Sequence, residues 1–254
     1  MSVKTVYSLS FFRHPSSAYE SERCGEARGI FFVNYFRAVV RAHWAVNADY
    51  ELWVHHDDRV IDFPYFKALV EMDKRKLLKL IYCREAKTLC GAMVWRLRPI
   101  WNEDVDFVLS RDLDALPTWR ERKAVETWKD IGNSPILGLH DSVSHKGAGL
   151  MGGMVSFRTG MVRPVMPRLP EDLPDHGDDQ RWLNSVVRPL FPSGVVLTGN
   201  LLGGKLHPID KLTNHVGGAF HVDPAVKWFD ENPGYCPRLD EIRECEEGAK
   251  CPTV

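Results

Sequence analysis

The chain has 254 residues and a formal net charge of −1, with 44% hydrophobic and 26% charged residues. This length suits one α/β domain with a sizeable core. A charge so close to zero argues against a broad surface for nucleic acid or for anionic membranes.

Strand-like and helix-like segments alternate four times in the first half of the chain. The expected strands are Val3–Phe12, Tyr50–His55, Leu77–Cys83 and Val105–Leu109. The expected helices are Glu26–Val46, Phe63–Lys76, Leu89–Leu97 and Thr118–Lys129. A capping box of Thr118 and Glu121 opens the last of these helices. The alternation predicts an α/β fold with a mainly parallel sheet flanked by helices.

Glycine and proline become frequent after Asn133. In this second half we expect strands at Met151–Phe157 and Val195–Thr198, and a helix at Asp178–Val187. The final residues, 221–254, are expected to form a loop-rich tail.

Two further features bear on where the protein works. The N-terminus lacks the apolar core of a signal peptide, and polar residues interrupt the most apolar helical stretch, so we expect no membrane span. The six cysteines show neither CxxC nor zinc-ribbon spacing. We therefore expect reduced, mostly structural cysteines and a cytosolic protein.

The most informative segment is an apolar strand that ends in two aspartates, Ser110-Arg111-Asp112-Leu113-Asp114. Alternation places Asp112 and Asp114 on the same side, just past the carboxyl end of the strand. Open α/β sheets bind their ligands at that edge. Two carboxylates there can share a hard divalent cation, which can bind a diphosphate. The alternative is a capped, solvated loop.

Together with other segments, this one resembles the GT-A class of nucleotide-sugar glycosyltransferases. More narrowly, the chain is similar to small viral and bacterial enzymes with a Ser-Arg-Asp-Leu-Asp core, including those of large algal viruses. The segments that carry the resemblance are 6–12, 93–96, 110–114, 120–125, 140–141, 145, 150–154, 178–183 and 215–218.

The resemblance implies a single GT-A-like domain over residues 1–220, with a nucleotide-binding half at about 1–130 and an acceptor half at 131–220. It implies a hexosyl- or pentosyltransferase that moves a sugar from a nucleotide-sugar donor, expected to be a UDP-sugar, to a glycan or glycoprotein acceptor. For a viral protein the compartment would be the host cytoplasm.

The resemblance also implies a Mn²⁺ or Mg²⁺ ion held by Asp112 and Asp114. A late histidine often completes the metal shell in related enzymes. His215 is the preferred candidate, because the glycines that follow it let the backbone approach a phosphate closely. His207 and His221 are the alternatives.

Residues expected at the donor come from several segments: Leu9, Ser10, Arg13, Arg96, Arg111, Asp112, Gly152 and Gly153. The two arginines Arg96 and Arg111 are expected either to orient the carboxylates or to contact the diphosphate. The glycine pair either forms a bulge or leaves room for the sugar.

An inverting reaction needs a general base, for which the candidates are Asp141, Asp178 and Asp179. Because Asp178 and Asp179 open a helix, one of them is expected to cap it and the other to face the sugar. A retaining reaction would need no such base.

Two other functions compete with this interpretation. A sugar nucleotidylyltransferase would use a similar sheet and similar metal chemistry, but the loop at 13–17 lacks the glycines typical of that class. A non-catalytic glycan-binding protein with the same fold is the second alternative, and the intact aspartate pair argues against it.

Overall fold

The computed structural model describes residues 3–12, 27–63, 65–84, 88–141, 149–168, 173, 177–192, 195–199, 206–213 and 221–249. At 27–34, 89–90 and 195–199 it describes the backbone alone.

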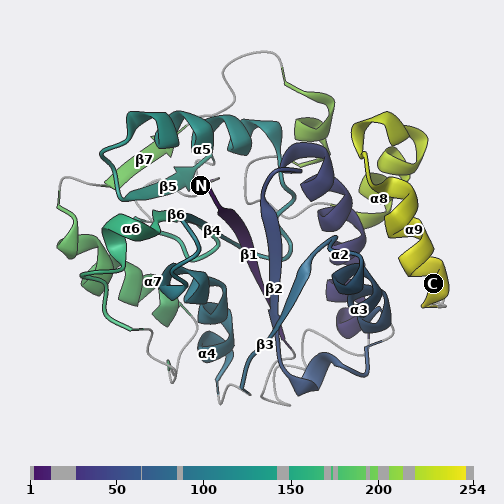
Figure 1. Ribbon diagram of the computed structural model, residues 1–254, viewed down its shortest axis with the longest axis horizontal. Helices are drawn as coiled ribbons and strands as arrows, with labels where there is room; N and C mark the ends of the chain where they lie inside the picture. Colours follow the sequence, from purple (N-terminus) through teal and green to yellow (C-terminus); the bar gives the residue numbers. More distant parts are fainter. Residues whose placement is uncertain are drawn as a thin grey trace.

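A seven-stranded sheet with the order β3-β2-β1-β4-β6-β5-β7 forms the centre of the molecule (Figure 1). Its strands are β1 (Thr5–Phe11), β2 (Glu51–His56), β3 (Lys79–Tyr82), β4 (Phe107–Arg111), β5 (Ile136–His140), β6 (Met154–Arg158) and β7 (Val195–Gly199). Strand β1 lies inside the sheet and all seven of its residues are buried, as expected for a strand covered on both faces.

Only β6 runs against its neighbours in this sheet. The pairs β1–β2, β1–β4, β2–β3 and β5–β7 are parallel, whereas β6 pairs with both β4 and β5 in the antiparallel sense. The six parallel strands therefore end at one edge, the carboxyl edge. Strand β6 begins at that same edge, which brings the segment before Met154 next to the residues after Arg111.

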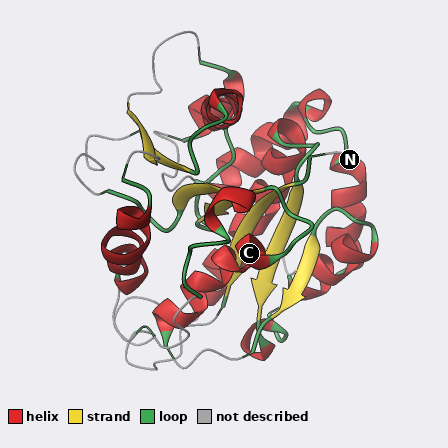
Figure 2. Ribbon diagram, turned by 60° about the vertical axis from the view of Figure 1, so that its left-hand side comes forward, coloured by secondary structure: helices red, strands yellow, loops and turns green. Residues whose placement is uncertain are grey.

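Helices cover both faces of the sheet (Figure 2). They are α2 (Ala27–Val46), α3 (Phe66–Lys74), α4 (Leu89–Met93), α5 (Trp119–Ile131), α6 (Thr159–Val162), α7 (Asp178–Trp182), α8 (Val222–Glu231) and α9 (Leu239–Gly248). Shorter helical turns are η1 (Asp58–Val60), η2 (Val94–Trp101), η4 (Leu183–Val187), η5 (Arg188–Leu190), η6 (Pro208–Leu212) and η7 (Pro233–Tyr235). Within the described residues, no helix is long and apolar enough to cross a membrane.

The alternation of β1 divides the hydrophobic core into two layers. Tyr7 and Leu9 belong to the layer that contains residues of α2, α3 and α5, whereas Val6 belongs to the layer that contains residues of η2, α6 and α7. The sheet is thus the middle of three layers.

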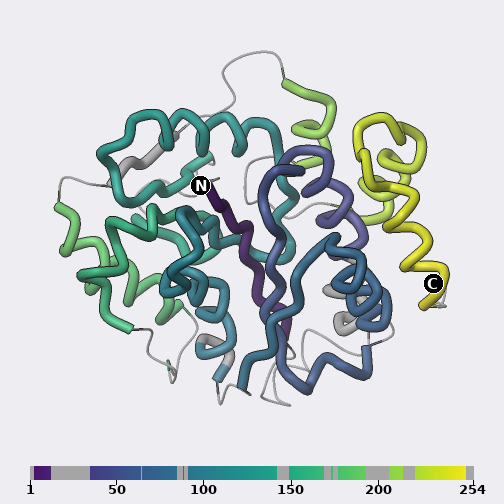
Figure 3. Tube along the Cα trace, in the orientation of Figure 1, coloured from purple at the N-terminus to yellow at the C-terminus, as the bar shows by residue number. Residues whose placement is uncertain are grey.

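The prediction of a loop-rich tail at 221–254 is wrong over residues 221–249. This region forms the helices α8 and α9, which lie beside α2 and α3 (Figure 3). A buried arginine of α2, Arg41, makes a two-pronged ion pair with Glu246 of α9 at 2.7 Å on each side, and Tyr65 donates to the same carboxylate at 2.6 Å. The charged sequence of this region suggested a solvated tail, but its charges are partners for α2 and α3.

Candidate functional site

The site begins where β4 ends. Strand pairing sets Arg111 opposite Met154, so the next residues outward, Asp112 and Gly153, face each other across the carboxyl edge. The Asp112 side chain is 41% exposed. Asp112 therefore stands at an accessible edge, as the alternation of β4 predicts.

Gly152 and Gly153 are needed because carboxylates occupy the space where side chains would be. A Cβ built on Gly153 would lie less than 3.0 Å from the Asp112 carboxylate. A Cβ built on Gly152 would also lie less than 3.0 Å from the Asp179 carboxylate, and 2.6 Å from Arg96 Nη2. From the sequence this pair was expected either to form a bulge or to leave room for the sugar. In the structure it leaves room for the acidic side chains of the site.

Arg96 connects two of these carboxylates. It forms an ion pair with Asp112 through Nη1, and its Nη2 lies 3.2 Å from Asp179 Oδ2. Both Arg96 and Asp179 are nearly fully buried. The backbone N–H of Arg96 donates to Ser10 Oγ at 3.0 Å, and Ser10 Oγ donates to the carbonyl of Met93 at 3.2 Å. Strand β1 thereby fixes the turn that carries Arg96.

Asp114, like Asp112, is partly buried. Burial, and secondarily the negative charge of Asp112, raise the pKa of Asp114 to about 6, although Arg96 opposes the shift. A hydrogen bond from the backbone N–H of Asp114 to its own carboxylate also opposes the shift. Two neighbouring carboxylates repel each other when little positive charge surrounds them, and a bound cation removes this repulsion.

Helix α7 separates the roles of Asp178 and Asp179. Gly177, with φ of +86°, occupies the N-cap position, so neither aspartate caps the helix as the sequence predicted. Asp178 pairs with Arg181 at the surface of the same helix, with Nε at 2.7 Å. Asp179 turns inward to Arg96, and its Oδ1 is buried without a hydrogen-bond partner among the described residues.

Arg111 has a different role from the one expected. Its side chain is fully buried, its Nε donates to Glu121 of α5 at 2.5 Å, and its Nη atoms donate to two backbone carbonyls and to Ser156 Oγ. It therefore fastens α5 to the sheet and does not reach the aspartates. Thr118 caps α5 as predicted, accepting from the backbone N–H of Glu121 at 3.2 Å.

Asp141 and Leu9 have partners outside the group of carboxylates around Arg96. Asp141 follows β5 and forms a buried ion pair with Arg120 Nη1 at 3.0 Å. The backbone N–H of Arg120 donates to Asp210 Oδ1 at 3.2 Å, so α5 and η6 both support this corner. The side chain of Leu9 is fully buried in the core.

Of the three histidines considered as metal ligands, the structure describes His207 and His221. His207 accepts from the backbone N–H of Ile209 and caps η6, while His221 is exposed before α8. His215 and Arg13 lie outside the described residues. Within the described ranges, no group of three or more His, Cys, Asp or Glu side chains is arranged to hold a metal ion.

Sequence reasoning missed the partners that position these groups. The anchoring of Arg96 by Ser10 joins residues 86 positions apart, and no local pattern marks it. His207 and Asp210 form the two bonds of a capping box, but neither residue type belongs to the usual sequence signature of that motif, so no local pattern pointed to Asp210. The ion pair of Arg120 with Asp141 also had no signal in the sequence.

No family model matches the sequence, and no curated protein matches it significantly. Solved structures do resemble it. The S. aureus TarS 1–349 complex with UDP-GlcNAc has a TM-score of 0.50 at 13% identity, covering 81% of this chain and 62% of that one. The mannosyltransferase PcManGT from Pyrobaculum calidifontis, in complex with GDP-Man and Mn²⁺, has a TM-score of 0.45 at 13% identity and covers 98% and 76%. An active-site mutant of LgtC has a TM-score of 0.43 at 13% identity and covers 98% and 97%.

At such identities the likeness concerns the fold. The predicted GT-A-like α/β fold, with its mainly parallel mixed sheet between helices, is confirmed. The chain spans 62% of the length of that TarS structure.

Proposed function

We propose that this protein is a metal-dependent glycosyltransferase that moves a sugar from a nucleotide-sugar donor, expected to be a UDP-sugar, to a glycan or glycoprotein. The observation that carries the proposal is the position of Asp112 and Asp114 just after β4, at the carboxyl edge of a GT-A-like sheet, where Gly153 leaves room for the Asp112 carboxylate. A TarS structure with a similar fold binds UDP-GlcNAc.

The residues present fit a small divalent cation. Mg²⁺ is usually held by one or two carboxylates, with further ligands from water and from substrate phosphates. Asp112 and Asp114 supply two carboxylates, and the raised pKa of Asp114 marks a place where added positive charge is favourable. His215 is our candidate for a third protein ligand. When bound, such a cation neutralises charge on the leaving diphosphate.

Arg96 is proposed to hold Asp112 in position and to add positive charge next to the diphosphate. Ser10 holds the backbone of Arg96, and two carboxylates hold its guanidinium. A planar guanidinium held in this way suits a phosphate oxygen as well as a carboxylate.

Among the three candidate bases, Asp179 is the one we propose to face the sugar. It belongs to the same cluster as Asp112 through Arg96, and its Oδ1 can still accept a hydrogen bond. Asp178 is tied to Arg181 at the surface, and Asp141 is tied to Arg120. In an inverting reaction Asp179 would take the proton of the acceptor hydroxyl, and in a retaining one it would orient the sugar.

Incubation with a panel of nucleotide sugars tests the proposal. With Mn²⁺ present, we expect slow hydrolysis of at least one UDP-sugar, measured as released UDP, and no hydrolysis above background with Asp112→Asn. Release of pyrophosphate from a nucleoside triphosphate and a sugar 1-phosphate would instead indicate a nucleotidylyltransferase. If no nucleotide sugar is bound or hydrolysed, the proposal is wrong.

A further inference from the structure

A cavity of about 630 Å³ lies at the edge of the sheet opposite the candidate site. Three of its lining residues are neighbours across adjacent strands: Thr5 begins β1, Phe107 begins β4, and Arg158 ends β6. A strand rises about 3.3 Å per residue, which places Phe107 and Asp112 about 17 Å apart. The cavity is therefore separate from the site around Asp112, and its volume is in the range of sites for small molecules.

The acidic groups of this cavity all have partners. Asp49 makes a two-pronged ion pair with Arg122 at 2.6 and 2.8 Å. Glu126 accepts from Tyr50 and from Lys129, the latter at 3.2 Å. Asp106 Oδ2 accepts from the backbone N–H of Lys4 at 2.7 Å. The carboxylates that line the cavity are thus engaged, which disfavours a cationic ligand.

Arg158 is the opposite case. No carboxylate lies within ion-pair distance of it in the described part of the chain. One N–H, on Nη2, donates to the carbonyl of Lys129 at 3.1 Å, and its buried Nε has no hydrogen-bond partner there. Burial lowers the pKa of Arg158, and no acidic side chain offsets the shift. A guanidinium without a counter-ion is the natural anchor for an anion.

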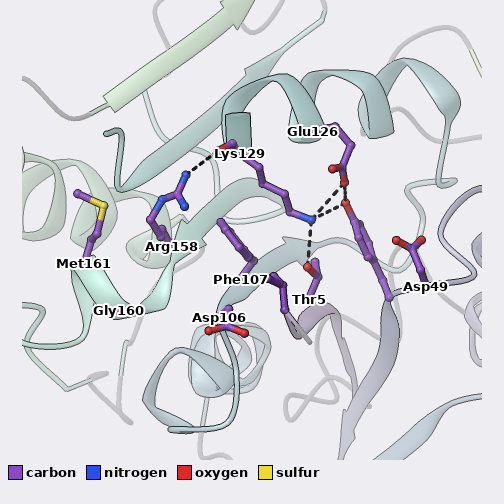
Figure 4. A pocket seen from close by; sticks show the side chains of 11 residues that line it. Thr5, Asp49, Asp106, Phe107, Glu126, Lys129, Arg158, Gly160 and Met161 are labelled. Carbon is purple, nitrogen blue, oxygen red and sulfur yellow. Dashed lines mark hydrogen bonds and ion pairs between the residues drawn. The ribbon is translucent and has the colours of Figure 1, made fainter. Parts of the chain in front are cut away.

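The surroundings of Arg158 add an apolar surface. Its guanidinium lies over the ring of Phe107, 4.8 Å from the ring centre, with Lys129 Nζ 5.0 Å from that centre. Figure 4 shows Arg158 between Met161 and Phe107, with Lys129 next to Phe107 and Gly160 below. A Cβ built on Gly160 meets no atom within 4 Å, so the space beside Arg158 is open.

We propose that this cavity binds a small organic anion whose carboxylate or phosphate pairs with Arg158 and whose apolar part lies against Phe107 and Met161. The cavity holds this ligand without a divalent cation, because the positive charge comes from Arg158 itself. Its binding is therefore independent of the proposed transferase reaction at the other edge.

Calorimetry and thermal shift in EDTA test the proposal with three probes of similar shape: benzoate, phenyl phosphate and the neutral benzamide. We expect benzoate or phenyl phosphate to bind the wild-type protein and raise its Tm, with benzamide at least tenfold weaker. The anion that binds more tightly identifies the ligand as a carboxylate or a phosphate.

Two variants and one control assign the binding to Arg158. Arg158→Met should weaken the anion at least tenfold, and so should Arg158→Gln, a polar replacement that serves as the test if Arg158→Met does not fold. Arg168→Met is the matched control, since Arg168 is exposed and stacks on Trp101 at 5.4 Å outside the cavity. The proposal is overturned if neither anion binds, if benzamide binds equally well, or if both Arg158 variants bind like the wild type.

Discussion

The carboxylate of Asp112 lies against Gly153, in space that any side chain at position 153 would occupy. This contact joins the end of β4 to the beginning of β6. Asp112 can keep its position only if residue 153 has no side chain.

Gly153→Ala is therefore expected to displace Asp112 and to weaken UDP binding in Mn²⁺ by at least tenfold, measured by calorimetry. Gly248→Ala is the control, because a Cβ there meets nothing within 4 Å. Wild-type affinity in Gly153→Ala would show that the position of Asp112 does not matter for the donor.

Arg96→Met should destabilise the protein, because it leaves the buried Asp179 without its counter-ion. Removal of one partner from a buried pair typically costs about 3–5 kcal/mol. Urea denaturation measures the free energy of unfolding, and the double variant Arg96→Met/Asp179→Asn should recover part of the loss. In the exposed pair, Arg181→Met should cost no more than about 1 kcal/mol. Equal losses in Arg96→Met and Arg181→Met would contradict the buried pair.

Glu246→Ala tests whether α9 belongs to the folded domain. The change leaves Arg41 buried and removes the acceptor of Tyr65, so we expect a loss of about 3–5 kcal/mol in the free energy of unfolding. Glu247→Ala, one residue later and exposed, should change stability by no more than about 0.5 kcal/mol. A detached tail would make the two variants indistinguishable.

His43 predicts sensitivity to acid. Burial lowers the pKa of His43 to about 4, below the ordinary value near 6.5. Between these two pH values the unfolded chain binds a proton that the folded protein does not, so stability falls as the pH is lowered from 6.5 to 4. The shift corresponds to about 3 kcal/mol. Denaturation curves across this range should show a shallower pH dependence in His43→Gln than in the wild type. Identical slopes would contradict a neutral, buried His43.

The sequence was sufficient for most strands of the sheet and for Asp112, because local patterns determine them. The apolar run of β4 ends in Arg111, with Asp112 and Asp114 after it, and Thr118 marks the start of α5 a few residues later. The tail could not be predicted in this way. The charges of α9 resemble a solvated surface until Arg41 and Tyr65 are brought to Glu246 by the fold.

Within the site, the sequence can place residues that directly follow a strand, but it cannot place residues that meet only through packing of the folded chain. Arg96 and Arg111 have the same side chain, and both lie close in sequence to the strand that carries the aspartates. Strand alternation puts Arg111, the last residue of β4, on the face opposite Asp112, where it pairs with Glu121. No local pattern marks the contact of Arg96 with Asp112.

The affinity for UDP with and without Mn²⁺ is the most direct test of the central claim, that Asp112 and Asp114 hold a cation that binds the donor. We expect calorimetry to show UDP binding in Mn²⁺ that is at least tenfold weaker in EDTA, in Asp112→Asn and in Asp114→Asn, because a diphosphate next to two carboxylates is repelled unless a cation lies between them. Equal UDP affinity in Mn²⁺ and in EDTA, unchanged by either substitution, would contradict the account.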